Sequence, residues 1–250
     1  MKLQEILDQL SSGEFSQISI GGAEAGVIDA TNYAKVVGHI NLGLTALYTR
    51  FNLKKGQVVV ELQPEQRLYK LHSSFADNVR YSRETLRYVK DTAADPFCDD
   101  ILKIEKILTD EDDEFPLNDA EAIYSIDTPR STHIMVPAVL VEAAEAADKP
   151  DWMDTTNLTI HYRANHPKIV VGQGYFNPER IEVELPASHL EALLFYVASR
   201  VQAPIGMSQE GAVAVQYSTR FEQACQILEG NGMQIDKVPT NTRLSRGGWA

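Results

Sequence analysis

Apolar residues recur at helical spacing near both ends of the chain and at strand-like spacing between them. After Pro186, apolar positions three or four residues apart define one buried helical face. They are Leu190, Leu193, Leu194, Val197 and Val201. A second run with the same period comprises Val213, Tyr217, Phe221, Ala224 and Leu228. Ala203-Pro204-Ile205-Gly206 separates the two runs and Gly230-Asn231-Gly232 follows the second, so the pattern predicts a helical hairpin.

The N-terminal part predicts two further helices. The shorter one is defined by Leu3, Ile6, Leu7 and Leu10 and ends at Ser11-Ser12-Gly13. The longer one, with Asp29 or Thr31 as its expected cap, has a longer apolar face. That face is Tyr33, Val36, Val37, Ile40, Leu44, Leu47, Tyr48 and Phe51. Gly38 and Gly43 each lower its helix propensity by about 1 kcal/mol relative to alanine. They are either tolerated in a core helix or allow a neighbouring helix to approach closely.

From Gln57 the period changes to the alternation of β-strands. Residues 57–63 and 68–71 predict a hairpin with its turn at Pro64-Glu65-Gln66. Further strands are expected at 101–107, 132–136, 158–163 and 181–185. Residues 73–95 read as loop with a little helix, and 139–147 as a short helix or a mobile segment.

The predicted fold class is α+β, in which the N- and C-terminal helices meet in a bundle around a β-rich insertion. The expected divisions are 1–56 for the N-terminal helices, 57–185 for the β-rich insertion, 186–232 for the helical hairpin and 233–250 for an extended tail. A chain of 250 residues with 44% hydrophobic content can bury a full core.

Composition and charge narrow the function classes. No apolar run approaches the roughly 20 residues that cross a bilayer, and acids within the N-terminal apolar pattern argue against a signal peptide. The net charge of −12 disfavours general nucleic-acid binding, although it suits a surface that DNA only passes. Cys98 and Cys225 are expected to be buried free thiols rather than a disulfide.

No catalytic or metal-binding motif is found along the chain. His133 and His161 fall on predicted strands, where a half-buried polar role is expected. His161 and His166 bracket a turn but have no acidic ligand at matching spacing. Gly172-Gln173-Gly174 reads as a turn rather than a phosphate loop. The pairs Asp99-Asp100 and Glu182/Glu184 could be acid/base couples. The acidic run 109–114 could hold calcium, but a solvated hairpin tip fits it better because the EF-hand glycine and glutamate are missing.

The last stretch, from Met233, has little periodicity and reverses the charge of the chain. After Asp236 it contains no acid, but it contains Lys237, Arg243 and Arg246, and it ends near Trp249. Such a tail is either disordered or docks on another subunit or partner, because arginine and tryptophan are frequent interface anchors.

Several stretches resemble the head-to-tail adaptor proteins of short-tailed bacteriophages, also called tail tubular or gatekeeper proteins. The resemblance uses diffuse patterns over most of the chain. They are residues 1–10, 40–51, Asp99-Asp100-Ile101-Leu102-Lys103-Ile104, Phe115-Pro116-Leu117-Asn118-Asp119, 158–167 and 186–230. Within the last, Tyr196-Val197-Ala198-Ser199-Arg200 and Tyr217-Ser218-Thr219-Arg220-Phe221 carry most weight.

This resemblance implies a structural virion protein rather than an enzyme, with no cofactor and no bound metal. It implies a ring, commonly twelve-fold, that sits below the portal protein in the neck and extends the DNA channel. Tail nozzle and tail fibre proteins would dock on it, and DNA would pass without sequence-specific contact. The chain would reside in the host cytoplasm during assembly.

By the same resemblance, the tail would contact the portal or a neighbouring subunit. The candidate residues are Lys237, Arg243, Leu244, Arg246 and Trp249. Two alternatives remain open: a tail nozzle or fibre-docking ring protein, and a stand-alone enzyme or cation-binding domain.

Overall fold

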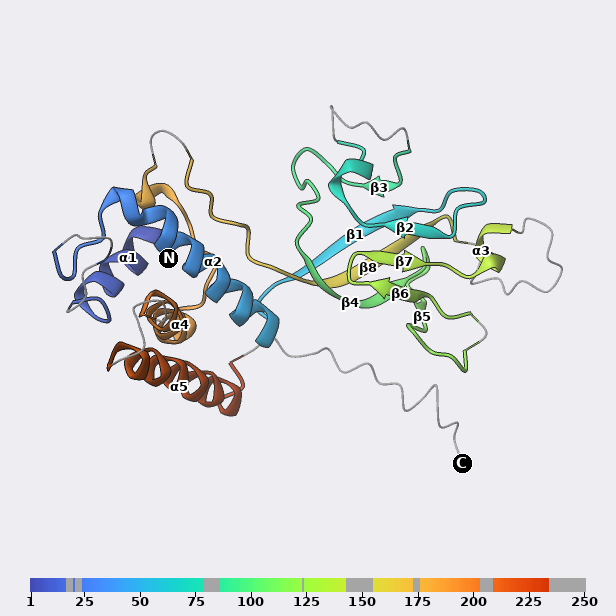
Figure 1. Ribbon diagram of the computed structural model, residues 1–250. Helices are drawn as coiled ribbons and strands as arrows, with labels where there is room; N and C mark the ends of the chain where they lie inside the picture. The colour runs from blue at the N-terminus through green and yellow to red at the C-terminus, as the bar shows by residue number, and fades with distance from the viewer. Residues whose placement is uncertain are drawn as a thin grey trace.

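The protein is described from a computed structural model that covers residues 1–16, 20, 24–78, 86–122, 124–142, 155–172, 176–202 and 209–233. It has a helical part and a β-rich part, which extended segments connect (Figure 1). Helices and antiparallel sheets are both present, so the predicted α+β class is confirmed. Each part has its own buried apolar core.

Four α-helices build the helical part. They are α1 (Leu3–Ser12), α2 (Tyr33–Arg50), α4 (Leu190–Gln202) and α5 (Gln209–Gly230). Short 3-10 turns, η1 (Ala30–Asn32) and η5 (Ala187–His189), precede α2 and α4. The predicted apolar faces of α1 and α2 are buried, apart from partly buried Tyr33. On α5, Phe221 and Leu228 are buried as expected, whereas Val213 is 37% exposed and Cys225 is fully buried.

The start of α2 differs from the prediction. Neither Asp29 nor Thr31 caps it, because η1 intervenes and places Asn32 at the cap position. The Asn32 side chain makes no capping bond and instead donates to the Ile20 carbonyl at 2.9 Å. The helix therefore begins from a 3-10 turn rather than from a side-chain cap.

Five antiparallel strands form the larger sheet in the order β3-β1-β8-β4-β5. They are β1 (Lys55–Glu61), β3 (Val89–Lys90), β4 (Ile101–Leu108), β5 (Glu114–Phe115) and β8 (Asn157–Ala164). In the central strand, Leu158, Ile160, Tyr162 and Ala164 are buried, which confirms the alternation that predicted this strand.

A second, three-stranded sheet runs in the order β2-β7-β6, with β2 (Leu68–Lys70), β6 (Asp127–Arg130) and β7 (His133–Met135). The predicted hairpin between residues 57–63 and 68–71 is therefore wrong, because β1 and β2 belong to different sheets. The alternating pattern identifies which face of a strand is buried, but it carries no information on the neighbouring strand. Residues of both sheets share one core.

Short helical elements fill out the β-rich part. They are η2 (Ser73–Phe75) and α3 (Ala138–Glu142). The first fits the little helix expected within 73–95, and the second covers the start of the segment 139–147. The rest of that segment lies outside the described residues.

Between β8 and α4, residues 165–172 and 176–185 pack on the helical core, although the sequence pattern had predicted that they belong to the β-rich insertion. Ile169, Val183 and Leu185 are buried there, and η4 (Pro178–Arg180) lies in the same segment. The expected strand 181–185 is wrong: in this stretch only Glu182 forms a bridge, with Lys2. The segment is extended because it lies along the N-terminus, where Leu3 N–H donates to the Ile181 carbonyl at 2.9 Å.

Side chains and loops cover strand edges in the β-rich part. The Tyr88 hydroxyl accepts from Lys70 N–H and donates to the Lys70 carbonyl, at 3.2 and 3.0 Å, in place of a neighbour for β2. At β6, Asn118 accepts from Thr128 N–H at 2.8 Å. These contacts satisfy backbone groups that could otherwise pair with another chain.

Among the described residues, no helix has the length and apolar character to cross a membrane.

Candidate functional site

The residues predicted to contact a portal or neighbouring subunit lie at the C-terminus. Lys237, Arg243, Leu244, Arg246 and Trp249 are outside the described residues. The same holds for Gln173 and Gly174 of the predicted turn and for residues 203–208 between α4 and α5.

The histidines are distributed over both parts of the molecule. His133 and His161 lie half-buried on β7 and β8, as predicted. Burial lowers the pKa of both, and also the pKa of His39, His166 and His189. Within the described part of the chain, no group of three His, Cys, Asp or Glu side chains is placed to hold a metal ion.

One Ser–His–Asp arrangement occurs, at η2, and the sequence pattern had not indicated it. His72 Nδ1 lies 2.9 Å from Ser74 Oγ, and its Nε2 lies 3.7 Å from Asp99 Oδ2. However, the same Nδ1 accepts from Ser74 N–H at 3.1 Å, and Asp99 is bound by the backbone and hydroxyl of Ser73, each at 2.5 Å. These contacts cap a 3-10 turn, and none of the hollows described below includes the serine. The arrangement is therefore structural.

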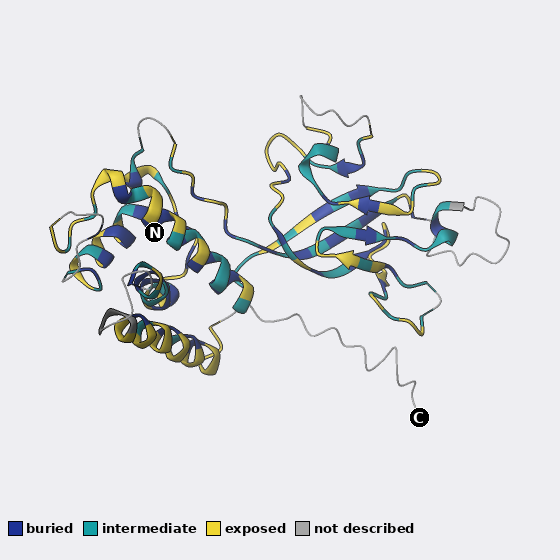
Figure 2. Ribbon diagram, viewed as in Figure 1, coloured by how far each residue is buried: buried dark blue, intermediate teal, exposed yellow. Residues whose placement is uncertain are grey.

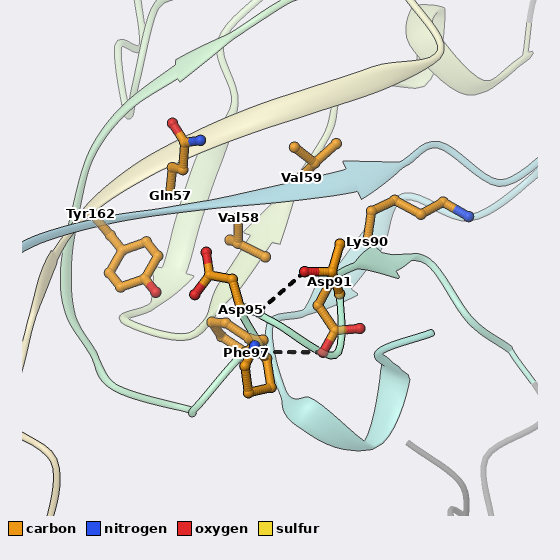
Figure 3. Close-up of a pocket in the computed structure, with 10 residues that line it drawn as sticks. Gln57, Val58, Val59, Lys90, Asp91, Asp95, Phe97 and Tyr162 are labelled. Atoms are coloured by element: carbon orange, nitrogen blue, oxygen red, sulfur yellow. Dashed lines mark hydrogen bonds between the residues drawn. The ribbon is translucent and has the colours of Figure 1, made fainter. Parts of the chain in front are cut away.

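A hollow of about 150 Å³ lies between β1, β3 and the loop that precedes β4 (Figure 3). Several polar groups around it have partners in the fold. Asp91 accepts from Phe97 N–H at 3.2 Å and from Asn78 N–H at 2.9 Å. Asp95 N–H donates to Thr92 Oγ1 at 3.1 Å, and Lys90 pairs with Glu61 at 2.7 Å. The polar groups here order a loop.

Carboxylates of the predicted acid/base pairs also bind partners within the fold. Asp100 accepts from the Tyr162 hydroxyl at 3.0 Å. Glu182 and Glu184 pair with Lys2 and Lys54 at 2.6 and 3.1 Å. All three carboxylates therefore make structural contacts. Of the two free thiols, Cys225 is buried as expected and Cys98 is exposed, so the prediction for Cys98 is wrong. It lies in the loop before β4, outside the sheet core.

The acidic run 109–114 forms the β4–β5 hairpin tip, as expected. Asp110 has a structural role there, because its carboxylate accepts from the backbone N–H groups of Thr156 and Asn157 at 2.9 and 3.0 Å. Desolvation opposes ionisation, but these bonds and those from side chains outweigh it and lower the pKa of Asp110 to about 2. Asp110 therefore connects the hairpin tip to the start of β8 by hydrogen bonds.

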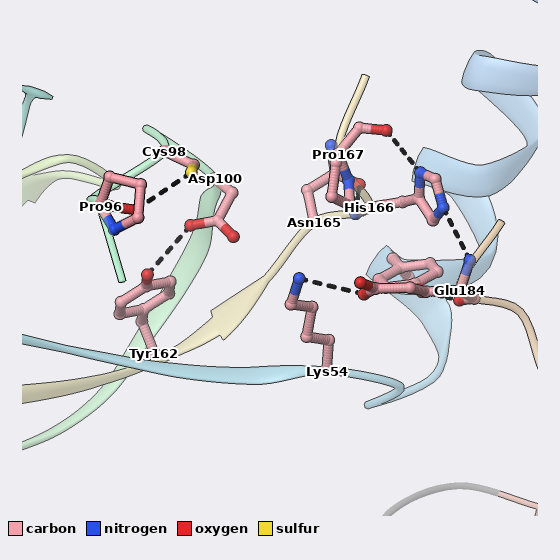
Figure 4. Close-up of polar contacts among 10 residues, drawn as sticks. Lys54, Pro96, Cys98, Asp100, Tyr162, Asn165, His166, Pro167 and Glu184 are labelled. Atoms are coloured by element: carbon pink, nitrogen blue, oxygen red, sulfur yellow. Dashed lines mark hydrogen bonds and ion pairs between the residues drawn. The ribbon is translucent and has the colours of Figure 1, made fainter. Parts of the chain in front are cut away.

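A polar network joins the helical and β-rich parts at the end of β8 (Figure 4). His166 is 7% exposed, and its Nε2 accepts from Glu184 N–H at 3.0 Å while its Nδ1 lies 2.6 Å from the Pro167 carbonyl. The Tyr48 hydroxyl of α2 donates to the Glu184 carbonyl. These contacts connect three elements: the end of β8, the extended segment before α4, and α2.

The network requires a neutral His166. Nε2 must be an acceptor for Glu184 N–H, so the proton belongs on Nδ1, which donates to Pro167. Burial lowers the pKa of His166 most strongly, with a smaller contribution in the same direction from Lys54, while the bond to Pro167 and the Glu184 carboxylate act to raise it. The geometry suits a structural connection between the parts.

One side of α5 is exposed along most of the helix. We define the outer face of α5 as the exposed residues opposite its buried side (Figure 2). They are Ala212, Val215, Gln216, Thr219, Gln223, Gln226, Ile227 and Gly230. None is charged, and Val215 and Ile227 are 65% and 63% exposed. An uncharged helix side on a chain of charge −12 has the charge depletion of an interface core.

A second feature is a groove of about 370 Å³ on α2, which we call the α2 groove. Its lining residues are Gly38, Asn41, Leu42, Leu44, Thr45, Asn165, His166 and Lys168. Leu42 is 54% exposed, and a methyl group added at Gly38 would meet no atom within 4 Å. Gly38 therefore faces open space, whereas Gly43 is the glycine that allows a neighbouring helix to approach, as discussed below.

Comparison with protein-family models and with curated proteins finds no match for this chain.

Sequence reasoning missed both helix faces as candidate sites. The outer face of α5 could have been found as one stripe at helical spacing that lacks charge, between Arg220 on one edge and Glu222 and Glu229 on the other. The α2 groove could not, because residues 165–168 of its wall lie far along the chain from α2.

Proposed function

We propose that the protein is a structural virion subunit, a head-to-tail adaptor of a short-tailed bacteriophage that assembles into a ring below the portal. The observation that carries the proposal is the outer face of α5. A helix that contributes only part of its surface to its own core, and presents an uncharged side outward, is suited to contact between subunits.

The described chemistry supports an assembly role over a catalytic one. The Ser74–His72–Asp99 arrangement caps a turn, and Asp91 beside the hollow of Figure 3 accepts from backbone N–H groups. A catalytic base needs a free position for a reacting atom. His72 and Asp91 are instead used within the fold.

The two-part architecture supports the same role. In a ring, the helical part would join neighbouring copies, and the β-rich part would extend away from it toward other components of the neck or tail. The net charge of −12 would let DNA pass through the ring without adhering, because phosphate binding depends on clustered lysine and arginine. Portal, nozzle and fibre proteins are the partners this role requires.

The test is binding to the portal protein of the same virus. Purified chain and portal are mixed and separated by sedimentation, and the chain is expected to migrate with the portal as a ring. A chain lacking residues 237–250 tests the proposed tail contact, and unchanged binding would remove the tail from the mechanism. A full-length chain that never migrates with the portal would overturn the proposal.

A further inference from the structure

We propose that the outer face of α5 in one copy packs into the α2 groove of the next copy. This inference rests on the proposed function as a ring subunit and identifies the two surfaces that would make the contact. The partner is a second copy of the same chain.

The two surfaces lie on different sides of the helical part. α4 lies between α2 and α5 and packs against both (Figure 1). The outer face of α5 and the α2 groove are both on helix sides turned away from α4, since Gly43 of α2 and Phe221 of α5 are the positions that meet it. A contact between two unlike surfaces repeats from copy to copy, and it closes into a ring where the rotation fits.

The helices that carry the two surfaces are of similar length. α2 has 18 residues and α5 has 22, which correspond to lengths of about 27 and 33 Å at the helical rise per residue. Gly38, the first α2 residue that lines the groove, leaves open space there. Val215 and Ile227 are exposed apolar side chains about 18 Å apart along the approaching helix, so Leu42 would lie against the part of the face between them.

The charges also match. Copies of a chain with charge −12 repel each other, and the outer face of α5 is a place where no carboxylate opposes their approach. At one edge of this face, Glu222 and Glu229, which both pair with Arg50, keep side chains 54% and 44% exposed. Exposed Lys35 and Lys168 lie on and beside α2 and form no ion pair within the described part of the chain. Opposite charges at the rim would set the register of the contact.

Strand addition is a less suitable mode of self-association. The backbone edge of β2 is occupied by the Tyr88 hydroxyl, and Asn118 binds the edge of β6. The helix faces therefore remain the better candidates.

Disulfide trapping tests the contact directly. In a Cys98→Ser background, Leu42→Cys is placed in one batch of protein and Thr219→Cys, on the outer face of α5, in another. A mixture of the two should give about tenfold more cross-linked dimer than either alone, because a specific contact raises the local thiol concentration. Leu68→Cys replaces a leucine of similar exposure, 52%, on β2 and serves as the matched control with Thr219→Cys. Each variant is first checked for the circular dichroism spectrum and thermal transition of the parent.

Both trapping mixtures are examined alone at high concentration and with the portal protein present. Dimer formation by Thr219→Cys alone would indicate that α5 contacts α5, which overturns the unlike pairing. A mixture that gives no more dimer than the Leu68→Cys control also overturns it. If rings form on the portal without this cross-link, the adaptor function stands and the assigned surfaces are wrong. If the cross-link forms without portal binding, the contact stands and the adaptor function fails.

Discussion

Gly43 of α2 lies directly against Leu193 of α4. A methyl group at Gly43 would stand 2.6 Å from Leu193 Cδ1 and 2.9 Å from Tyr196 Cδ1, closer than van der Waals contact allows. The absence of a side chain at this position lets the two helices pack closely, so Gly43 sets the spacing on which the helical core depends.

The two glycines of α2 should respond oppositely to alanine. Gly43→Ala should lower the free energy of unfolding by about 1 to 3 kcal/mol, because the new methyl group overpacks the interface with α4. Gly38→Ala should raise it by about 0.5 to 1 kcal/mol, because the site has open space and alanine favours the helix. Urea denaturation measures both. Equal effects of the two substitutions would contradict the assigned orientation of α2.

Arg50 fastens the end of α2 to α5. Its guanidinium pairs with Glu222 and Glu229 at 2.6 and 2.7 Å, and these hydrogen bonds raise its pKa further above its usual range. Arg50→Met should destabilise the protein by about 1 kcal/mol and speed amide hydrogen exchange in residues 221–230. Lys2→Met, which breaks the more exposed pair with Glu182, is the control and should leave exchange in α5 unchanged. Unaltered α5 exchange in Arg50→Met would show that the ion pairs contribute nothing to holding the helix.

Asp110 should be important for the β-rich part despite its place in an exposed acidic run. Asp110→Asn removes the charge that accepts from Thr156 and Asn157 N–H, and should cost about 1 to 2 kcal/mol after allowance for solvent exposure. Because the pKa of this carboxyl is lowered to about 2 from 3.8, its contribution is complete above pH 3.8 and is lost as the pH falls toward 2. Glu111→Gln, in the same run, should have little effect. Denaturant midpoints at neutral pH compare the two variants.

His166 should make stability depend on pH. Its pKa is lowered from 6.5 in the folded chain, so the neutral form is favoured by folding. Stability is therefore complete above pH 6.5 and declines as the pH falls below that value toward the lowered pKa. His166→Gln keeps an acceptor for Glu184 N–H but does not titrate, so its denaturant midpoint should change less than that of the parent between pH 7 and 5. The variant should still show some pH dependence, because the other histidines with lowered pKa also titrate. An identical pH dependence in both proteins would exclude a contribution from His166.

The helices and most strands could be predicted from the sequence because burial of one face produces a regular period. Leu3, Ile6, Leu7 and Leu10 are buried on α1 as their spacing indicates, and the alternation of residues 158–163 is that of β8. Strand pairing could not be predicted, because β1 and β2 are neighbours in sequence but belong to different sheets. Residues 181–185 alternate as a strand does, yet they lie beside the N-terminus and Val183 is buried in the helical core.

The candidate site was less accessible to sequence reasoning than the fold. Its two surfaces are defined by what is left exposed after packing, and that depends on which side of α2 and α5 meets α4. The sequence pattern allowed the same two interpretations for Gly38 and Gly43. The packing distinguishes them, because Gly43 faces Leu193 and Gly38 lines the groove. The C-terminal candidates, Arg243 and Trp249 among them, lie outside the described residues.

The central claim is that the chain acts by joining copies of itself on a portal. Size-exclusion chromatography with light scattering, performed on the chain alone and with portal protein, measures this directly. We predict a single chain of 27.8 kDa in isolation, and with portal a complex whose mass exceeds that of the portal by a whole number of chains, with twelve expected. A chain that still elutes at its monomer mass beside an unchanged portal peak would contradict the claim.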